Sequence, residues 1–295
     1  MRLGLDIGGT KIDAVALSDD GDVAGLVRVP TGHGPDAVVA AAVAAARQAA
    51  ELAGGVPTSL GAGIPGVVDP ATGRVRHAVN LGVVDLGLGA LLAERLGVPV
   101  RVENDVNAAS LGAYHLLGLD GPMAFLNLGT GVAAGFVSGG RLWRGARGTA
   151  GEIGHIPIDP DGARCNCGQR GCVETVASGG GVARQWATDA PFPVLDVFDR
   201  ADAGDPAALA VRDRLAAGAA AAVRILVLTA DVETVVIGGG VSSLGDRLLR
   251  LVAAALAEQA AVSGFLASLE LPARVRLAPQ ERPVAAIGAA LAEPA

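Results

Sequence analysis

The sequence has few aromatic residues, few cysteines and a single lysine among its 295 residues. Phe, Trp and Tyr make up 3% of the chain although the apolar fraction is 51%, so its cores must be built mainly from Ala, Val and Leu. An uninterrupted apolar stretch of about 20 residues, which a membrane-spanning helix requires, is also missing. We therefore expect no membrane partner, and the length suggests two domains of ordinary size.

The charge balance excludes another class of partner. The formal net charge is −7, whereas a nucleic-acid surface needs a basic patch. ATP remains compatible with this charge, because backbone N–H groups and Mg²⁺ can hold its phosphates. Arginine supplies 22 of the 23 Lys and Arg side chains. The one lysine, Lys11, falls inside a Gly-rich loop, which suggests a specific role for its ammonium group.

The amino-terminal residues, MRLGLDIGG, run from one arginine directly into an apolar strand pattern and an acidic loop. This pattern differs from that of a secretory signal peptide. Free thiols without an export signal favour a cytoplasmic protein.

The three cysteines lie within eight residues, at Cys165, Cys167 and Cys172, and His155 stands ten positions before the first. One imidazole and three thiolates form the ligand set of a tetrahedral structural Zn²⁺. Three ordinary buried thiols are the plainer alternative, but chance rarely gathers every cysteine beside a histidine. A disulfide competes poorly, because the number of cysteines is odd and Cys165 is too close to Cys167 for easy pairing.

Two carboxylates, Glu152 and Glu174, flank this cluster. If one ring nitrogen of His155 binds the metal, the other is left as a hydrogen-bond donor. Glu152, His155 and Glu174 would then form a polar cluster suited to a polyhydroxyl ligand. Two solvated surface carboxylates are the alternative.

Alternating strand and helix patterns predict an α/β fold with largely parallel sheets. The segments Leu5–Thr10 and Leu126–Gly131 share an apolar strand, a short polar residue and a Gly/Thr turn, which indicates a duplicated unit rather than chance similarity. The linker between the halves is expected near Gly118–Pro122. The main helices are expected over Pro35–Leu52, Asp85–Leu96, Asp105–Leu117, Glu174–Ala187, Pro206–Thr229 and Pro283–Ala292.

Three Gly-rich turns follow predicted strands, at Gly8–Thr10, Gly129–Gly131 and Gly238–Gly240. Such turns expose N–H groups and let a phosphate or a purine approach the backbone. None has the P-loop or dinucleotide pattern, and plain hairpin turns are the alternative. Glu103-Asn104-Asp105 and Gly63–Gly66 each end a strand, where α/β folds bind ligands. An isolated Asp105 could equally be a helix N-cap.

These motifs carry a resemblance to a known family. DIGGTK at Asp6–Lys11, GIPG at Gly63–Gly66, END at Glu103–Asp105, LGTG at Leu128–Gly131 and EIGH…CNCG…GCVE within Gly151–Glu174 occur in one order along nearly the whole chain. The chain resembles the ROK family of bacterial sugar kinases, and within it the ATP-dependent glucokinases. The resemblance implies an actin-like, ribonuclease-H-like fold of two lobes with a cleft between them: residues 1–118 with a carboxyl-terminal helix at 283–295, and residues 119–282.

The resemblance also implies roles for individual residues. Asp105 matches the base that takes the proton of the sugar 6-hydroxyl, and Asp6 matches a carboxylate near Mg²⁺. The matched sugar contacts are Gly66, Asn104, Asp105, Glu152, His155 and Glu174. The matched nucleotide contacts, with ATP as the donor, are Asp6, Gly8, Gly9, Thr10, Lys11, Gly129, Thr130, Gly131, Gly239 and Gly240. The matched zinc ligands are His155, Cys165, Cys167 and Cys172. Family members are usually homodimers, and a tetramer is the other assembly we consider.

Two departures bear on the sugar rather than on the kinase activity. The segment Asn80–Leu86 lacks the Trp common there in family glucokinases, and Val173 stands between Cys172 and Glu174. Glucose is therefore the first expectation and an N-acetylhexosamine, GlcNAc or ManNAc, the second. A polyphosphate donor fits less well, because such relatives generally lack the zinc stretch.

Non-catalytic alternatives are a purely structural zinc protein and a sugar-sensing ROK regulator. By the same resemblance, the regulators carry an amino-terminal helix-turn-helix of about 80 residues before the phosphate loop. Asp6 of that loop lies only five residues after Met1, so we expect the kinase rather than the regulator.

Overall fold

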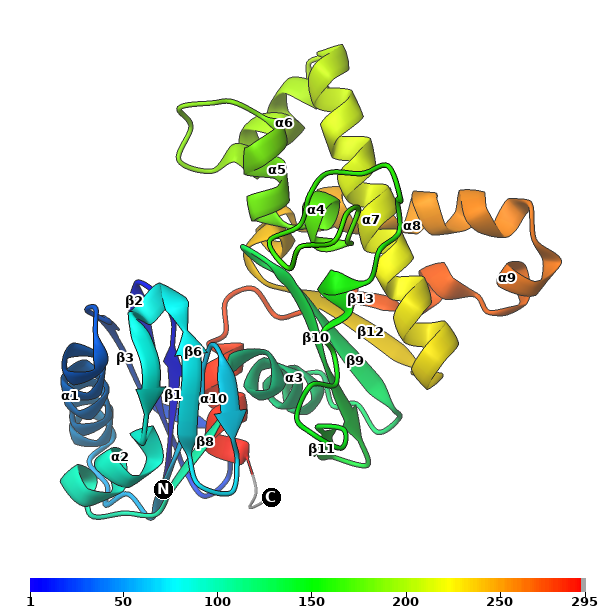
Figure 1. Cartoon of the computed structure of the whole chain (residues 1–295). Helices are drawn as coiled ribbons and strands as arrows, with labels where there is room; N and C mark the ends of the chain where they lie inside the picture. Colours follow the sequence, from blue (N-terminus) through cyan, green and yellow to red (C-terminus); the bar gives the residue numbers. More distant parts are fainter. Residues whose placement is uncertain (293–295) are drawn as a thin grey trace. The chain divides into compact units, whose positions relative to one another are not determined.

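The computed structural model describes residues 1–292 and divides into two compact units (Figure 1). Unit 1 contains Met1–Asp120, Gly140–Gly148 and the described residues from Glu281 onward; unit 2 contains Gly121–Gly139 and Thr149–Gln280. The predicted division placed residues 140–148 with the second half, whereas they group with unit 1 here. Residues 293–295 of the predicted carboxyl-terminal helix lie outside the described residues.

Unit 1 is built on a five-stranded sheet in the order β3-β2-β1-β4-β8. β1 pairs antiparallel with β2, and it pairs in parallel with β4, which pairs in parallel with β8. The carboxyl ends of β1, β4 and β8 therefore meet at one edge of the sheet, where both the DIGG and END motifs lie. The bounds are β1 (Arg2–Ile7), β2 (Lys11–Leu17), β3 (Val23–Pro30), β4 (Ser59–Ile64) and β8 (Val100–Asn104).

The helices of unit 1 are α1 (Pro35–Ala53), α2 (Leu88–Leu96), α3 (Asp105–Leu116) and α10 (Val284–Leu291). Small residues let α10 approach its neighbours closely. A Cβ added at Gly61 on β4 would lie 1.8 Å from Ala289 O, and one added at Gly288 would lie 1.8 Å from Ala108 O on α3. These glycines therefore allow the last helix to pack directly on the sheet and on the helix that follows END.

A second, three-stranded sheet in the order β5-β6-β7 completes unit 1 with a short helix and a short strand. The sheet consists of β5 (Val67–Asp69), β6 (Arg74–Ala78) and β7 (Val83–Leu86), with η1 (Val79–Leu81) between the last two. The short strand, which is not part of this sheet, is β11 (Arg141–Trp143) in segment 140–148. The expected helix at Asp85 was placed too early: Asp85 pairs with Arg76 in β7, and helix α2 begins at Leu88.

Unit 2 repeats the strand order of unit 1 with β10-β9-β12-β13. β9 pairs antiparallel with β10 and in parallel with β12, as β1 does with β2 and β4. This correspondence agrees with the predicted duplication. The bounds are β9 (Met123–Leu128), β10 (Val132–Ser138), β12 (Thr234–Gly238) and β13 (Val275–Leu277).

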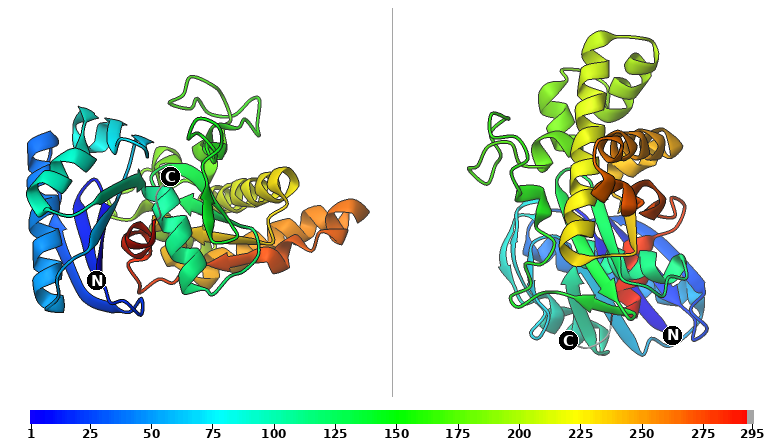
Figure 2. Two further views of the ribbon diagram at one scale, coloured as in Figure 1. Left: turned by 90° about the horizontal axis from the view of Figure 1, so that it is seen from below. Right: turned by 90° about the vertical axis from the view of Figure 1, so that its right-hand side faces the viewer.

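Helices pack against this second sheet, as Figures 1 and 2 show for the long helix α7. Asp205 caps α7 by accepting hydrogen bonds from Ala207 N and Ala208 N, at 2.8 and 3.2 Å. The expected single helix from Glu174 to Ala187 is wrong, because Ser178 has an extended ψ of 158° and caps a second helix through Gly181 N. The helices are α4 (Glu174–Ala177), α5 (Gly179–Gln185), α6 (Pro193–Asp202), α7 (Pro206–Ala230), α8 (Asp246–Ala261) and α9 (Gly264–Ser268), with 3₁₀ turns η2 (Ile153–His155), η3 (Gly240–Leu244) and η4 (Leu271–Arg274).

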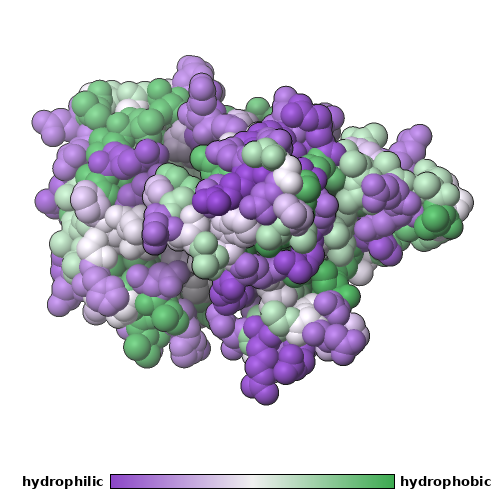
Figure 3. All heavy atoms as spheres, turned by 90° about the horizontal axis from the view of Figure 1, so that it is seen from above, coloured by the Kyte–Doolittle hydropathy of each residue, from purple (hydrophilic) through white to green (hydrophobic). Residues whose placement is uncertain are grey.

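Each unit has its own apolar core, made mostly of Ala, Val and Leu as the composition suggested. On the face drawn in Figure 3, hydrophilic and hydrophobic groups are intermixed. Among residues 1–292, none of the helices combines the length and apolar character needed to span a bilayer.

Candidate active site

The END motif forms the junction between β8 and α3. Asn104 is the N-cap of α3: its Oδ1 accepts hydrogen bonds from Val106 N at 2.9 Å and Asn107 N at 3.3 Å. Its Nδ2 donates to Gly66 O at 3.3 Å. Asp105 is the first residue of the helix rather than its cap. The alternative role considered for Asp105, an N-cap, therefore belongs to its neighbour.

Glu103, the first residue of the motif, is a buried charge that the sequence did not single out. It is 4% exposed, and its Oε2 lies 2.6 Å from an Arg144 guanidinium nitrogen. Its Oε1 accepts hydrogen bonds from Asn107 Nδ2 at 2.9 Å and from Asn104 N at 3.0 Å. This network joins segment 140–148 to the END turn within unit 1.

Asp6 lies at the carboxyl end of β1, beside the Gly8–Thr10 turn. Burial, followed by the charges of Asp105 and Asp13, raises the pKa of Asp6 from 3.8 to about 7, and Lys11 opposes this shift. Asp6 and Asp105 thus lie close enough to repel each other at one edge of the sheet. A paired set of oxygen ligands that resists carrying both charges fits a divalent cation such as Mg²⁺.

The glycine turn beside Asp6 is held by backbone bonds. Gly8 N donates to Lys11 O at 2.9 Å, and Thr31 Oγ1 donates to Gly8 O at 2.6 Å. The Nζ of Lys11 lies 3.9 Å from Asp13 Oδ2. The predicted phosphate-binding residues Gly8, Gly9, Thr10 and Lys11 follow β1 and therefore lie at the same sheet edge as Asp6 and the END motif. The edge is shared because β1, β4 and β8 run parallel.

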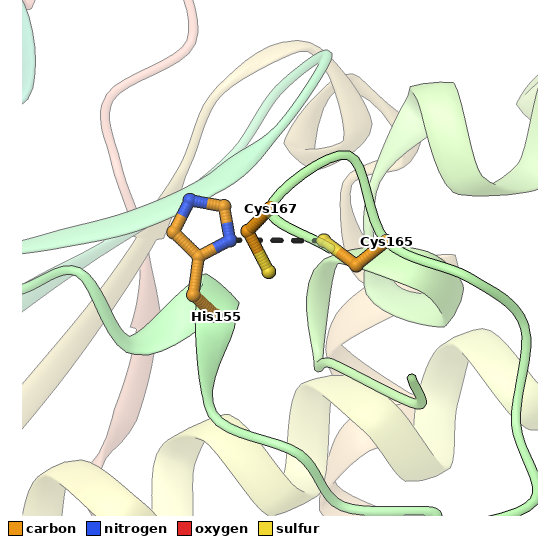
Figure 4. A group of neighbouring side chains, drawn as sticks. All are labelled: His155, Cys165 and Cys167. Carbon is orange, nitrogen blue, oxygen red and sulfur yellow. Dashed lines mark hydrogen bonds between the residues drawn. The ribbon is translucent and has the colours of Figure 1, made fainter. Parts of the chain in front are cut away.

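Three of the four predicted zinc ligands, His155, Cys165 and Cys167, converge in unit 2 (Figure 4). The ligand atoms of His155, Cys165 and Cys167 lie within 4.8 Å of one another. Cys165 Sγ is 3.7 Å from His155 Nδ1, and Cys167 Sγ is 3.7 Å from Cys172 Sγ. Tetrahedral Zn²⁺ with Zn–S bonds of about 2.3 Å would separate two sulfurs by about 3.8 Å, so these spacings fit the metal. The three thiols form no disulfide.

The loop around the ligands is a small hairpin. Cys165 N donates to Gln169 O at 2.9 Å, and Gly171 N donates to Ala163 O at 2.9 Å. Gly171 has a φ of +63°, and a Cβ there would overlap Asp159 O. Hydrogen bonds from Gln169 lower the pKa of Cys167 to about 6, whereas burial raises that of Cys172 to about 12.

His155 faces in two directions. Its Nδ1 lies toward Cys165, while its Nε2 lies 3.9 Å from Glu152 Oε2. The ring can therefore give one nitrogen to a metal and keep the other beside a carboxylate, which is the arrangement typical of metal-bound histidine. Glu152 is 62% exposed, so its carboxylate stays open to a ligand.

Glu174 lies at the start of α4 and connects the cysteine hairpin to a glycine turn. Its Oε2 accepts a hydrogen bond from Val132 N at 3.1 Å, directly after the turn Gly129–Gly131. A Cβ at Gly131 would lie 2.6 Å from the same oxygen. The structure thus places a predicted sugar contact against a predicted phosphate turn, a link that the sequence spacing did not show.

A cavity of about 730 Å³ opens beside this turn within unit 2. Gly129, Thr130 and Gly240, three of the predicted nucleotide contacts, line it. Gly239 does not line it, but it has a φ of +84° where a Cβ would lie 2.6 Å from Leu128 O. The remaining lining residues, which the sequence did not suggest, are Gly179, Gly180, Ala183, Pro191, Phe192, Pro193, Val194, Leu195, Val241, Ser243 and Leu244.

The chain matches the ROK family over residues 2–293. It is 38% identical over 277 residues to a glucokinase of Halalkalibacterium halodurans, covering 84% of this chain and 82% of that one. It is 34% identical over 259 residues to an N-acetylmannosamine kinase of Yersinia pseudotuberculosis, covering 85% and 87%.

Solved structures agree with these sequence matches. A ROK hexokinase from Thermus thermophilus has a TM-score of 0.84 and 34% identity, over 98% of this chain and 96% of that one. A ROK glucokinase from Streptomyces griseus, solved with glucose and AMPPNP, has a TM-score of 0.81 and 31% identity, over 99% and 98%. The protein therefore belongs to the ROK family and has the actin-like fold of its sugar kinases.

Proposed function

We propose that the protein transfers the γ-phosphoryl group of ATP to the 6-hydroxyl of glucose. The observation that carries this proposal is the END turn, where Asn104 caps α3 and Asp105, the first residue of that helix, lies near Asp6 at the same edge of the sheet. The glucokinase of H. halodurans, 38% identical, supports the reaction, and the S. griseus complex supports the two ligands.

The proton transfer is assigned to one carboxylate. Asp105 accepts the proton of the 6-hydroxyl as that oxygen forms its bond to the γ-phosphorus. The bond between the γ-phosphorus and the bridging oxygen breaks, and ADP leaves with those electrons. Positioning and charge neutralisation account for most of the rate enhancement of such transfers.

Mg²⁺ would neutralise phosphate charge, and Asp6 is the carboxylate that would lie near it. The pKa of about 7 fits this role, because a nearby cation would favour the charged form of Asp6. The N–H groups of the Gly8–Thr10 and Gly129–Gly131 turns would hold the phosphates, with Lys11 adding a positive charge.

The proposed sugar contacts are Gly66 through its backbone, Asn104, Asp105, Glu152, His155 and Glu174. A structural Zn²⁺ on His155, Cys165, Cys167 and Cys172 would fix the His155 ring. With all four positions filled by protein, that metal has no site for a reacting water. We further propose a cytoplasmic homodimer or tetramer.

The sugar can be identified by measuring ADP release with ATP and each of glucose, mannose, GlcNAc and ManNAc. We expect the largest kcat/KM with glucose. The N-acetylhexosamines are the second candidates, since the segment at Asn80–Leu86 lacks Trp and a ManNAc kinase is 34% identical. Background ADP release with all four sugars would exclude hexose phosphorylation.

The nucleotide site can be tested at Gly240. A Cβ there would meet no atom within 4 Å, so Gly240→Val should fold normally while its side chain enters the cavity. We expect a several-fold increase in the KM for ATP and no change in the KM for glucose. Gly264→Val is the matched control, because a Cβ at Gly264 also meets nothing within 4 Å but this residue lies outside the cavity.

A further inference from the structure

The cavity beside the Gly129–Gly131 turn is apolar over most of its lining. One wall is the segment Pro191–Leu195, which closes the loop between α5 and α6 that projects from these helices in Figure 1. Another part of the lining comes from η3. Proline, valine, leucine and phenylalanine side chains there offer contact area but no hydrogen bonds.

The polar groups of the lining are few and mostly engaged. Among the described residues that line the cavity, only Thr130 and Ser243 have polar side chains. Ser243 Oγ donates to Gly240 O at 2.7 Å. The carbonyl oxygens of Gly129 and Thr130 accept from Gly179 N and Gly180 N, at 2.8 and 3.2 Å.

The backbone of the apolar wall is also engaged in hydrogen bonds within the protein. Phe192 O accepts hydrogen bonds from Leu195 N and Asp196 N, at 3.1 and 3.2 Å. The loop before it is fixed by Trp186 Nε1, which donates to Asp196 Oδ2 at 2.7 Å. These bonds tie Phe192 to Leu195 and Asp196, and Asp196 to Trp186 before the loop, so the wall offers a nucleobase a held apolar surface.

We infer that this cavity selects its nucleotide by the size of the base and not by the hydrogen-bonding pattern of the base edge. This inference rests on the proposed function, since it assumes that the cavity holds the donor's base. Adenine, guanine and hypoxanthine differ mainly in polar edge groups, whereas pyrimidines have a smaller ring. Apolar pockets discriminate weakly between ligands of similar shape, while pockets that hydrogen-bond the ligand reject mismatches strongly.

Phe192 is the residue best placed to contact the base face. Its side chain lines the cavity, yet the residue remains 70% exposed. A base bound beside it would cover part of that surface, and aromatic rings gain from such offset stacking. Stacking depends little on which purine is bound, so Phe192 should support ATP and GTP alike.

The first experiment compares ATP, GTP, ITP and CTP as donors at saturating glucose. We expect kcat/KM for GTP and ITP to stay within about tenfold of that for ATP. CTP should be the poorest donor. A larger preference for ATP over the other purines would overturn the inference while leaving the proposed kinase activity intact. Absence of turnover with ATP itself would instead contradict the proposed function.

The second experiment replaces Phe192 with Ala, with Phe265→Ala as the matched control. Phe265 in α9 is 65% exposed and lies outside the cavity. Phe192→Ala should raise the KM for ATP and GTP by the same factor, about fivefold, and leave kcat and the glucose KM unchanged. Phe265→Ala should change none of these values. Unchanged nucleotide KM values in Phe192→Ala, or a rise for one purine alone, would contradict the inference.

Discussion

At the scale of single residues, Asp105 is the residue on which turnover should depend. Asp105→Asn keeps the shape of the side chain but cannot accept the proton, so kcat should fall by roughly 10²–10⁴-fold. Glucose binding, measured by calorimetry, should change little. Asp36→Asn is the control, because Asp36 also lies in the first turn of a unit 1 helix. Wild-type turnover in Asp105→Asn would remove the assigned base.

The buried pair Glu103–Arg144 should matter for stability more than any surface pair. Arg144→Gln leaves a carboxylate that is 4% exposed without its cation, and should lower the free energy of unfolding by about 3 kcal/mol. Adding Glu103→Gln should restore much of that loss, since the unpaired charge is removed. The free energies of unfolding of both single variants and of the double variant can be measured by urea denaturation.

The exposed pair Arg74–Asp85 provides the comparison. Arg74 bonds both carboxylate oxygens of Asp85, at 2.6 and 2.7 Å, but both side chains are more than 40% exposed. Arg74→Gln should cost less than about 1 kcal/mol. Equal losses in Arg74→Gln and Arg144→Gln would show that burial does not govern the Glu103 network.

Asp6 should make the folded protein less stable as pH rises, whereas most carboxylates with a shifted pKa have the opposite effect. Its pKa rises from 3.8 to about 7 on folding, so the folded state binds more protons between these values. Stability should therefore fall as pH rises through this window. Asp6→Asn should be more stable than wild type above pH 7, by on the order of 3 kcal/mol without Mg²⁺, and equal to it below about pH 4. A pH-independent difference would contradict the assigned shift.

At the scale of elements, the cysteine hairpin should act as one unit. Cys167→Ser should lose bound zinc, lower Tm and raise the glucose KM strongly, because His155 and Glu152 lose their common support. The KM for ATP should rise less, through the bond from Val132 N to Glu174. Arg170→Ala is the control, since Arg170 lies in the same hairpin and its side chain donates a hydrogen bond to Gly162 O at 3.3 Å.

Metal content and both KM values should be measured together on the same preparations. A zinc-free Cys167→Ser protein with an unchanged glucose KM would show that the hairpin is remote from the sugar. The placement of Glu152, His155 and Glu174 in the sugar site would then be wrong.

Elements defined by local signals could be predicted from the sequence. The α7 helix follows from an Ala-rich run after Asp205, and β1 and β9 follow from apolar runs that end in glycine turns. The break at Ser178 could not, because it depends on a side-chain bond to Gly181 N within an otherwise helical pattern. The small sheet was missed because its strands are short and mostly exposed.

The same distinction holds for the candidate site. The zinc ligands were predictable because they lie close together in the sequence. The structure groups the ligand atoms of His155, Cys165 and Cys167, and Cys172 Sγ lies 3.7 Å from Cys167 Sγ. Glu103 and Arg144 are 41 positions apart, so no local pattern links them. The apolar wall at Phe192 has no motif at all, and only the cavity reveals it.

At the scale of the whole molecule, the duplicated strand order gives each unit one glycine turn at the end of its first strand. Unit 1 adds the acidic groups Asp6 and Asp105 to its turn, and unit 2 adds the cysteine hairpin and the apolar cavity. The two units therefore share a common framework, and the residues around each glycine turn give each unit a different chemistry.

The central claim, ATP-dependent phosphorylation at the sugar 6-hydroxyl, is tested most directly by following both products in one reaction. ADP should be measured together with glucose 6-phosphate, the latter by its oxidation with glucose-6-phosphate dehydrogenase. We predict equal amounts of both products with glucose, and only background ADP with 6-deoxyglucose, which lacks the accepting oxygen. ADP release that is as fast with 6-deoxyglucose as with glucose, or that yields no glucose 6-phosphate, would contradict the account.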